Sequence, residues 1–187
     1  SGTSSAANAN TVMGDTSGDI TATVTATGAV ATLNTALSNA SATDILTLVL
    51  DATSVAAADL NTLNGKTSVA VNANTIETMT GSASAVKTAL EHAGITDDGG
   101  IVITLDSGTA TATDLTDIAE ETSATVVATA ITAISGTAAE VAAVVSGDIT
   151  TGNYTSTLSG TSSAANANTV MGDTSGNITA TVLPPAL

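Results

Sequence analysis

Short runs of apolar, mostly β-branched residues recur along the chain and predict β-strands. The runs at residues 45–50 (ILTLVL) and 101–105 (IVITL) are almost continuously apolar, which is typical of strands buried on both faces of a parallel sheet. Shorter runs have Gly, Asp, Ser or Asn nearby, as strand ends usually do. These shorter runs lie at residues 20–25, 68–71, 125–131 and 154–158.

Between these strands, apolar residues recur with the spacing of an α-helix. Residues 82–92 place Val86 and Leu90 on one face, and Gly94 follows as a suitable helix stop. Two further patterns of this kind and three shorter helical turns lie at residues 29–37, 137–145, 8–12, 59–63 and 114–119.

Strand and helix alternate about every 26 residues, which predicts an α/β fold. Parallel strands need a crossover, and the helices would supply it. We expect a repeat solenoid of short parallel strands alternating with short helices, with about 26 residues per coil and one continuous sheet. The residues expected to face one another across the core are Val69, Val71, Ile103 and Val127 on the strands, and Val86, Leu90, Val141, Val145, Leu33 and Leu37 on the helices.

The chain also repeats its own sequence. Residues 1–24 recur at residues 159–182 with a single difference, Asp19 against Asn177. Near-identity over this length indicates duplication of a whole unit. We therefore expect residues 1–158 to be one full tandem repeat and residues 159–187 to begin the next, in a chain that is a slice of a longer array.

A weaker repeat of roughly 50 residues lies inside this period. TSVAAADLNTLNGKTS, from Thr53, aligns with TATATDLTDIAEETS, from Thr109. In the same way TGSASAVKTALEHAGI, from Thr80, aligns with SGTAAEVAAVVSGDI, from Ser135. The three sub-repeats span approximately residues 1–51, 52–106 and 107–158.

The charge of the chain disfavours several classes of partner. Its net charge is −15, and Lys66 and Lys87 are the only basic residues apart from one His. An acidic chain repels phosphate backbones and anionic membrane surfaces, so we expect no nucleic-acid partner. No apolar run approaches the roughly 20 residues that span a bilayer, and membrane insertion is not expected.

The composition favours a thin core. The chain has no Cys, Phe or Trp, and Tyr154 is its only aromatic residue, although large rings usually fill a globular core. The alternative is disorder, which is common in Ser-, Thr- and Gly-rich chains. Because the apolar fraction is 43% and is patterned, a folded chain is favoured.

Two segments resemble a known family. AADLNTLNGKTSVAVNANTIETMTG, residues 57–81, and SGTAAEVAAVV, residues 135–145, resemble repeats in the giant cell-surface proteins of marine cyanobacteria, of the type needed for swimming without flagella. The resemblance extends over nearly the whole chain apart from residues 183–187. It implies an extracellular, cell-surface location and a structural or adhesive role, and it supplies no catalytic residues.

Asp97 and Asp98, in the sequence TDDGG, are the candidate metal ligands. Acidic turns that contain Gly can hold Ca²⁺ through oxygen ligands, and calcium is the one cofactor that we consider. Asp15 and Asp19 lie in a similar turn, but Lys66 aligns with Asp15, and a ligand position should not tolerate Lys. The alternative interpretation of all these carboxylates is that they lie in solvated turns.

The sequence does not suggest an enzyme. His92 is the only His, and it follows Glu91 near the end of a predicted helix, where it should be exposed. A general base needs a nucleophile and an orienting partner, and neither is indicated beside it.

Two functional hypotheses remain. The first is an extracellular structural array that forms part of a cell-surface filament, layer or motility-associated fibre. The second is an adhesin repeat that binds a glycan or a surface and is stabilised by calcium. An adhesin should place aromatic or clustered polar residues at the same site of every repeat, but the counterparts of Tyr154 are not aromatic. We therefore favour the array, with self-association or neighbouring repeats as the partner, because open ends present unpaired strand edges.

Overall fold

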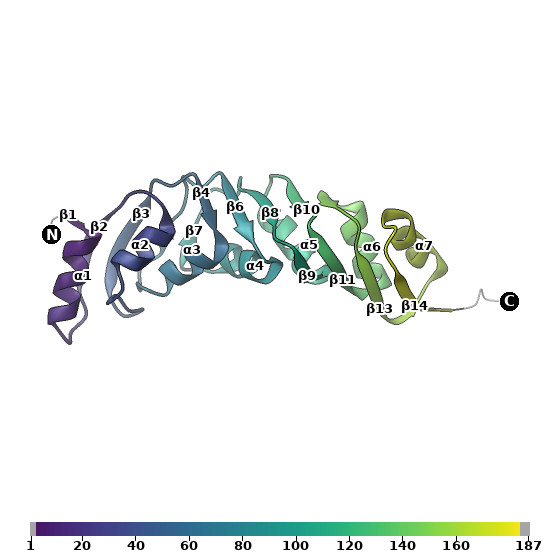
Figure 1. The fold of residues 1–187 in the computed structure, drawn as a ribbon, viewed down its shortest axis with the longest axis horizontal. Coiled ribbons are helices and arrows are strands. Elements are labelled where there is room, and N and C mark those ends of the chain that lie inside the picture. Colours follow the sequence, from purple (N-terminus) through teal and green to yellow (C-terminus); the bar gives the residue numbers. More distant parts are fainter. Residues whose placement is uncertain (1–2, 184–187) are drawn as a thin grey trace. The chain divides into compact units, whose positions relative to one another are not determined.

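The protein folds into two compact units, each of α/β class. The structure is a computed structural model, and it describes residues 3–183. Within this range unit 1 comprises residues 3–79 and 88–101, and unit 2 comprises residues 80–87 and 102–183. In each unit short parallel strands alternate with short helices, as the apolar pattern predicts (Figure 1).

Seven helices lie within residues 3–183, and they begin 24 to 29 residues apart. This interval brackets the 26 residues expected from the sequence. The helices are α1 Ala6–Asp15, α2 Val30–Ala36, α3 Ala57–Asn64, α4 Ala83–Glu91, α5 Ala112–Glu121, α6 Ala138–Ser146 and α7 Ala164–Asp173. The strands are β1 Thr3–Ser5, β2 Thr21–Ala26, β3 Ile45–Leu50, β4 Ser54–Ala56, β5 Val71–Asn72, β6 Thr78–Gly81, β7 Ile95–Thr96, β8 Val102–Leu105, β9 Gly108–Thr111, β10 Val126–Ala128, β11 Ile131–Thr137, β12 Ile149–Thr151, β13 Thr155–Ser162 and β14 Ile178–Val182.

The expectation of one continuous sheet is wrong, because the strands are divided among three sheets. Their strand orders are β1-β2-β3-β5-β7, β12-β10-β8-β6-β4 and β14-β13-β11-β9. The strand pairs with a defined register are parallel, and their partner residues are 20 to 24 positions apart. For α3 to α6, the strand before the helix and the strand after it belong to different sheets. The run at residues 125–131 is accordingly split by a turn into β10 and the start of β11.

The most apolar strands are buried on one face only, which corrects the expectation of burial on both. In β3, Leu46, Leu48 and Leu50 are buried, whereas Ile45 and Val49 are about half exposed. In β8, the alternate residue Val102 is likewise exposed. Successive side chains of a strand point to opposite faces, and here the second face carries no covering layer.

The expected core is largely confirmed, with three corrections. The buried residues that were expected are Val71, Ile103, Val86, Leu90, Val141, Leu33 and Leu37. Val127 is only half-buried because Val126 and Ala128, one position to either side, take the inward face of β10. Val145 is also half-buried, since α6 buries Val144 instead. Val69 lies in the bend before β5 and is half-buried.

Several helix starts are fixed by side-chain caps. The hydroxyl of Thr111 accepts a hydrogen bond from the Asp114 nitrogen at the start of α5. At the start of α6, Thr137 and Glu140 form a capping box, in which each side chain accepts a bond from the other's backbone nitrogen. The hydrogen bonds from Thr137 lower the pKa of the Glu140 carboxyl. At α5 and α6 the Thr that ends the preceding strand therefore fixes where the helix begins.

Candidate functional site

Four threonines, each followed by Ser, lie just after helices and form the most regular polar feature of the chain. They are Thr16, Thr67, Thr122 and Thr174, here called the turn threonines. Thr67, Thr122 and Thr174 are buried, although threonine is usually an exposed residue. A buried hydroxyl requires hydrogen-bond partners, and the structure supplies them from the backbone.

The hydroxyl of Thr174 is fully bonded. It donates to the Tyr154 carbonyl oxygen at 2.7 Å, and it accepts from the Tyr154 nitrogen at 2.9 Å and the Gly176 nitrogen at 3.0 Å. One donated and two accepted bonds use the whole capacity of a hydroxyl group. Thr174 therefore joins the end of α7 to the residue that precedes β13, 20 residues earlier.

Thr67 repeats this arrangement in unit 1. Its hydroxyl donates to the Leu46 carbonyl oxygen at 2.8 Å and accepts from the Leu46 nitrogen at 3.0 Å and the Val69 nitrogen at 3.0 Å. Leu46 lies 21 residues earlier, in β3. The turn threonine thus bonds to both backbone groups of one residue in the previous strand–helix unit.

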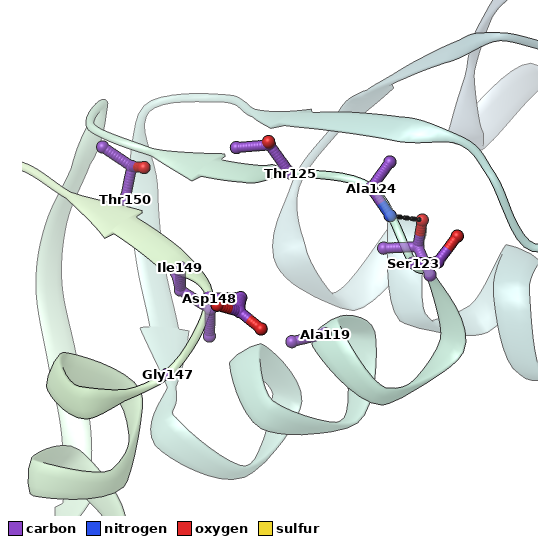
Figure 2. A pocket seen from close by; sticks show the side chains of 9 residues that line it. Ala119, Ser123, Ala124, Thr125, Gly147, Asp148, Ile149 and Thr150 are labelled. Atoms are coloured by element: carbon purple, nitrogen blue, oxygen red, sulfur yellow. Dashed lines mark hydrogen bonds between the residues drawn. The ribbon is translucent and has the colours of Figure 1, made fainter.

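Thr122 lines a pocket of unit 2, which Figure 2 shows. Its hydroxyl accepts from the Ala124 nitrogen at 3.1 Å. The pocket encloses about 550 Å³ between two helix-to-strand turns, the one at residues 122–125 and the one at residues 147–150. Asp148 is the one titratable side chain of its lining. The pocket can donate and accept hydrogen bonds, and it lies where successive turns approach one another.

The two copies of the repeated segment have the same local structure. Ser5 caps α1 by accepting from the Asn8 nitrogen at 3.2 Å, and Ser163 caps α7 by accepting from the Asn166 nitrogen at 3.2 Å. The register between β1 and β2 pairs Thr3 with Thr23, and the equivalent residues pair in the same way between β13 and β14. Apart from Asp19 against Asn177, the copies therefore differ mainly in their surroundings.

The first copy, in unit 1, is covered by the segment that follows it. The Asn10 side-chain oxygen accepts from the Asn39 nitrogen at 2.7 Å, and the Asn39 side chain donates to the Asn10 carbonyl oxygen at 3.1 Å. The Asp19 carboxylate accepts from the Thr43 hydroxyl at 2.7 Å. Polar side chains thus join α1 to the turn after α2, and the turn after α1 to the turn before β3.

The second copy, in unit 2, is covered by the segment that precedes it. Besides the bonds of Thr174, the Thr151 hydroxyl donates to the Asp173 carboxylate at 2.9 Å, and the Ser175 hydroxyl donates to the Asn153 side-chain oxygen at 2.9 Å. Tyr154 is buried in this contact. Burial and the charge of Asp173 raise the pKa of the Tyr154 hydroxyl far above its usual range.

Asp44 is a buried carboxylate with a structural role. It accepts from the Ile20 nitrogen at 2.8 Å, from the Ser41 nitrogen at 2.8 Å and from the Ser41 hydroxyl at 3.1 Å. Burial opposes its charge, but these hydrogen bonds outweigh burial and lower the pKa of the carboxyl. The charged form therefore stabilises the contact between β2 and the turn before β3.

We expect Asp44→Asn to destabilise unit 1 by about 2 kcal/mol at neutral pH, because the bonds of a charged acceptor are lost. The folded-state pKa lies below the unfolded one, so the stabilisation is present above about pH 4 and is lost as the pH falls through the folded-state pKa. The difference between wild type and variant should therefore shrink by pH 3. Urea denaturation at both pH values measures it, with Asp15→Asn, an exposed carboxylate, as control. An equal difference at both pH values would contradict this role for the charge.

Asp97 and Asp98, the expected calcium ligands, lie in the turn between β7 and β8. The Asp97 carboxylate accepts from the Gly99 nitrogen at 2.7 Å, and the Asp98 carboxylate accepts from the Gly100 nitrogen at 3.1 Å. Asp98 also lines a pocket of about 440 Å³ in unit 1 with Asp51 and Glu77. Within residues 3–183, no three acidic, His or Cys side chains are close enough together to hold one metal ion.

Calcium binding at Asp97 and Asp98 stays a prediction. If it occurs, added calcium should raise the melting temperature and a chelator should lower it, because an ion that binds only the folded state stabilises it. The variant with both Asp97→Asn and Asp98→Asn should lose this response. Magnesium at the same ionic strength controls for charge screening. A response that persists in the double variant would place the ion elsewhere.

His92 lies directly after α4 and is exposed, as expected. Its Nδ1 atom accepts from the Gly94 nitrogen at 3.0 Å, and the Asn64 side chain lies 3.2 Å from the same atom. These contacts give His92 a local role at the end of the helix.

Both lysines connect neighbouring helices or the turns after them. The Lys66 ammonium donates to the Leu37 carbonyl oxygen at the end of α2, at 2.9 Å. The Lys87 ammonium donates to the carboxylates of Asp114, at 3.1 Å, and of Asp117 in α5. In a chain of net charge −15, the two basic side chains thus join successive helices.

The turn threonines were not predicted from the sequence, although a signal was present. The dipeptide Thr-Ser follows a helical pattern at residues 16, 67, 122 and 174, and the aligned sub-repeats keep it.

No protein-family model, curated protein or solved structure matches this chain. In the part of the chain that the structure describes, no helix has the length and apolar character needed to cross a membrane.

Proposed function

We propose that this chain belongs to an extracellular structural repeat protein, in which α/β coils of about 26 residues stack as a solenoid. The array would form part of a cell-surface filament, layer or motility-associated fibre, with a role that is not enzymatic. The partner would be the neighbouring repeat or another copy of the same protein.

The turn threonine carries this proposal. Thr67 and Thr174 each bond to both backbone groups of a residue in the previous strand–helix unit. The same polar contact in both units favours stacking of successive coils over separate domains joined by linkers. The helix interval of 24 to 29 residues and the parallel strand pairing also support stacking.

The extracellular location rests on the resemblance of residues 57–81 and 135–145 to cell-surface repeats. A net charge of −15 is compatible with a protein that has to stay soluble beside a surface. Immunogold labelling of intact cells of the source organism, with antibodies raised against this chain, tests the location. Label on intact cells is expected, and label that appears only after permeabilisation would overturn it.

The stacking is tested separately by electron microscopy of the purified chain. Strands that stack at about 4.8 Å give an advance of roughly 29 Å for six coils. A rod with that advance per 158-residue period supports the solenoid. Separate globules joined by flexible links would overturn it.

An adhesin repeat is the second candidate. The pocket lined by Asp51, Glu77 and Asp98 is the observation that favours it, because carboxylates in a pocket can accept hydrogen bonds from sugar hydroxyls. A glycan array probed with the chain, in calcium and in chelator, tests this function. Binding that is lost in Asp51→Asn would support it, and absence of binding in both conditions would contradict it.

A further inference from the structure

The two copies of the repeated segment bury different faces of the same helix. Val12 is 52% exposed in α1, whereas the equivalent Val170 is 0% exposed in α7. The neighbouring residue behaves in the opposite way, since Met13 is 7% exposed and the equivalent Met171 is 52% exposed. The same sequence thus presents one bare apolar face in unit 1 and the other in unit 2.

The glycines of the segment show the same complementarity. A Cβ atom on Gly176 would lie 2.0 Å from the Tyr154 carbonyl oxygen, whereas at the equivalent Gly18 the nearest atom is the Thr16 hydroxyl oxygen at 3.8 Å. Conversely, a Cβ atom on Gly14 would lie 2.8 Å from the Asn39 side-chain nitrogen, but nothing lies within 4 Å at the equivalent Gly172. Each copy therefore has space at the glycine where the other copy is packed closely against a neighbouring segment.

The polar contacts follow the same division. Thr174 is buried and bonded to Tyr154, whereas the equivalent Thr16 is exposed, with its hydroxyl accepting from the Gly18 nitrogen at 3.2 Å. Asn10 is half-buried against Asn39, whereas the equivalent Asn168 is exposed. The bare faces thus carry the same hydrogen-bonding groups that are used in the other copy.

We infer that these two bare faces are the two sides of a contact between successive repeats, each with a defined occupant. The face of the first copy, with Val12, Thr16 and Gly18, receives a segment with the sequence of residues 138–158 from the preceding repeat. The face of the second copy, with Met171 and Gly172, receives a segment with the sequence of residues 27–50 from the following repeat. This inference rests on the proposed array, because both occupants are neighbouring repeats.

The contacts of each occupant are inferred from the copy of the segment in which the equivalent contact is already formed. The segment for Val12 is the one that covers Val170, and it supplies the backbone of Tyr154 and the side chains of Thr151 and Asn153. The segment for Met171 supplies the counterparts of Asn39 and Thr43. Position 177 is Asn in place of Asp19, and its side-chain oxygen can still accept the bond from the Thr43 counterpart.

The test uses thiol labelling, because the chain has no Cys of its own. Val12→Cys is labelled in the full chain and in the full chain preceded directly by a copy of residues 1–158. We expect the added repeat to slow labelling at position 12 on the order of a hundredfold, since reaction would then require local opening. The same substitution within the added copy itself should remain fast, which is the matched internal control.

Three further variants make the result decisive. Val170→Cys should be slow in every chain, which shows that unit 2 is folded. Met171→Cys should become slow when Val182 is followed directly by residues 25–50. Replacing residues 147–158 of the added repeat with residues 95–106 should leave Val12→Cys fast. Fast labelling at position 12 behind the correct repeat, or equal protection by the replaced segment, would overturn the inference.

The result is independent of the proposed location. If position 12 is protected but cells carry no surface label, the contact stands and the extracellular function fails. If cells carry the label but position 12 stays reactive, the function stands and the contact fails.

Discussion

Gly176→Ala is expected to destabilise the segment formed by α7 and β14 by about 3 kcal/mol, while Gly18→Ala should change stability by less than about 0.5 kcal/mol. The two glycines are equivalent positions of the repeated segment. A Cβ atom at position 176 would overlap the Tyr154 carbonyl oxygen at 2.0 Å, and a backbone atom cannot move aside as a side chain can. At position 18 the nearest atom would be the Thr16 hydroxyl oxygen at 3.8 Å, which is an ordinary van der Waals contact.

Hydrogen exchange is the suitable measurement, because the end of a repeat structure can open without unfolding the rest. Amides of residues 164–182 should exchange on the order of a hundredfold faster in Gly176→Ala, with amides of α5 little changed. Gly18→Ala provides the matched control in the same sequence context. Unchanged exchange in Gly176→Ala would mean that the turn at residues 174–176 does not pack against Tyr154.

The strands that the sequence predicts well are those with large apolar residues. The run at residues 45–50 matches β3, and β13 begins at Thr155, one residue into the run at residues 154–158. Strands β4, β6 and β9 were not predicted because they are short and rich in Thr, Ser and Gly. In β4, for example, Val55 is the one buried residue, and such a strand resembles a loop in composition.

Two of the three wrong core assignments, Val127 and Val145, are errors of one position. Val127 was expected to face the helices, but Val126 and Ala128 do so, and in α6 Val144 replaces Val145. Each of these runs is apolar at adjacent positions, so the period does not determine which residue points inward. The segments that pack against each run determine which residue is buried, and these segments are distant in the sequence.

The role of the turn threonines is non-local for the same reason. Thr-Ser after a helix is an ordinary turn sequence. The local hydrogen bond from the Gly176 nitrogen to the Thr174 hydroxyl could therefore be expected. The bonds to Tyr154 depend on a strand that begins 20 residues earlier. The recurrence of Thr-Ser in the aligned sub-repeats was the available sign that the threonine does more than form a turn.

The one-sided burial of β3 leads to the second large effect. Leu48→Ala should cost about 3 to 4 kcal/mol, because Leu48 is fully buried and the change leaves a cavity in a thin core. Ile45→Ala removes the same number of atoms from the same strand, but Ile45 is about half exposed, so its cost should stay below about 1 kcal/mol. Urea denaturation followed by circular dichroism measures both.

This pair of variants also tests what faces the outer side of the sheet. The outer face of β3 carries Ile45 and Val49, which are about half exposed. Because few atoms pack against these side chains, truncating either of them should cost little free energy of unfolding. If Ile45→Ala proved as costly as Leu48→Ala in the isolated chain, the outer face would have to be covered by other parts of the protein in solution. If the cost of Ile45→Ala rose only with protein concentration, self-association would cover that face, because association adds stability that grows with the logarithm of the partner concentration.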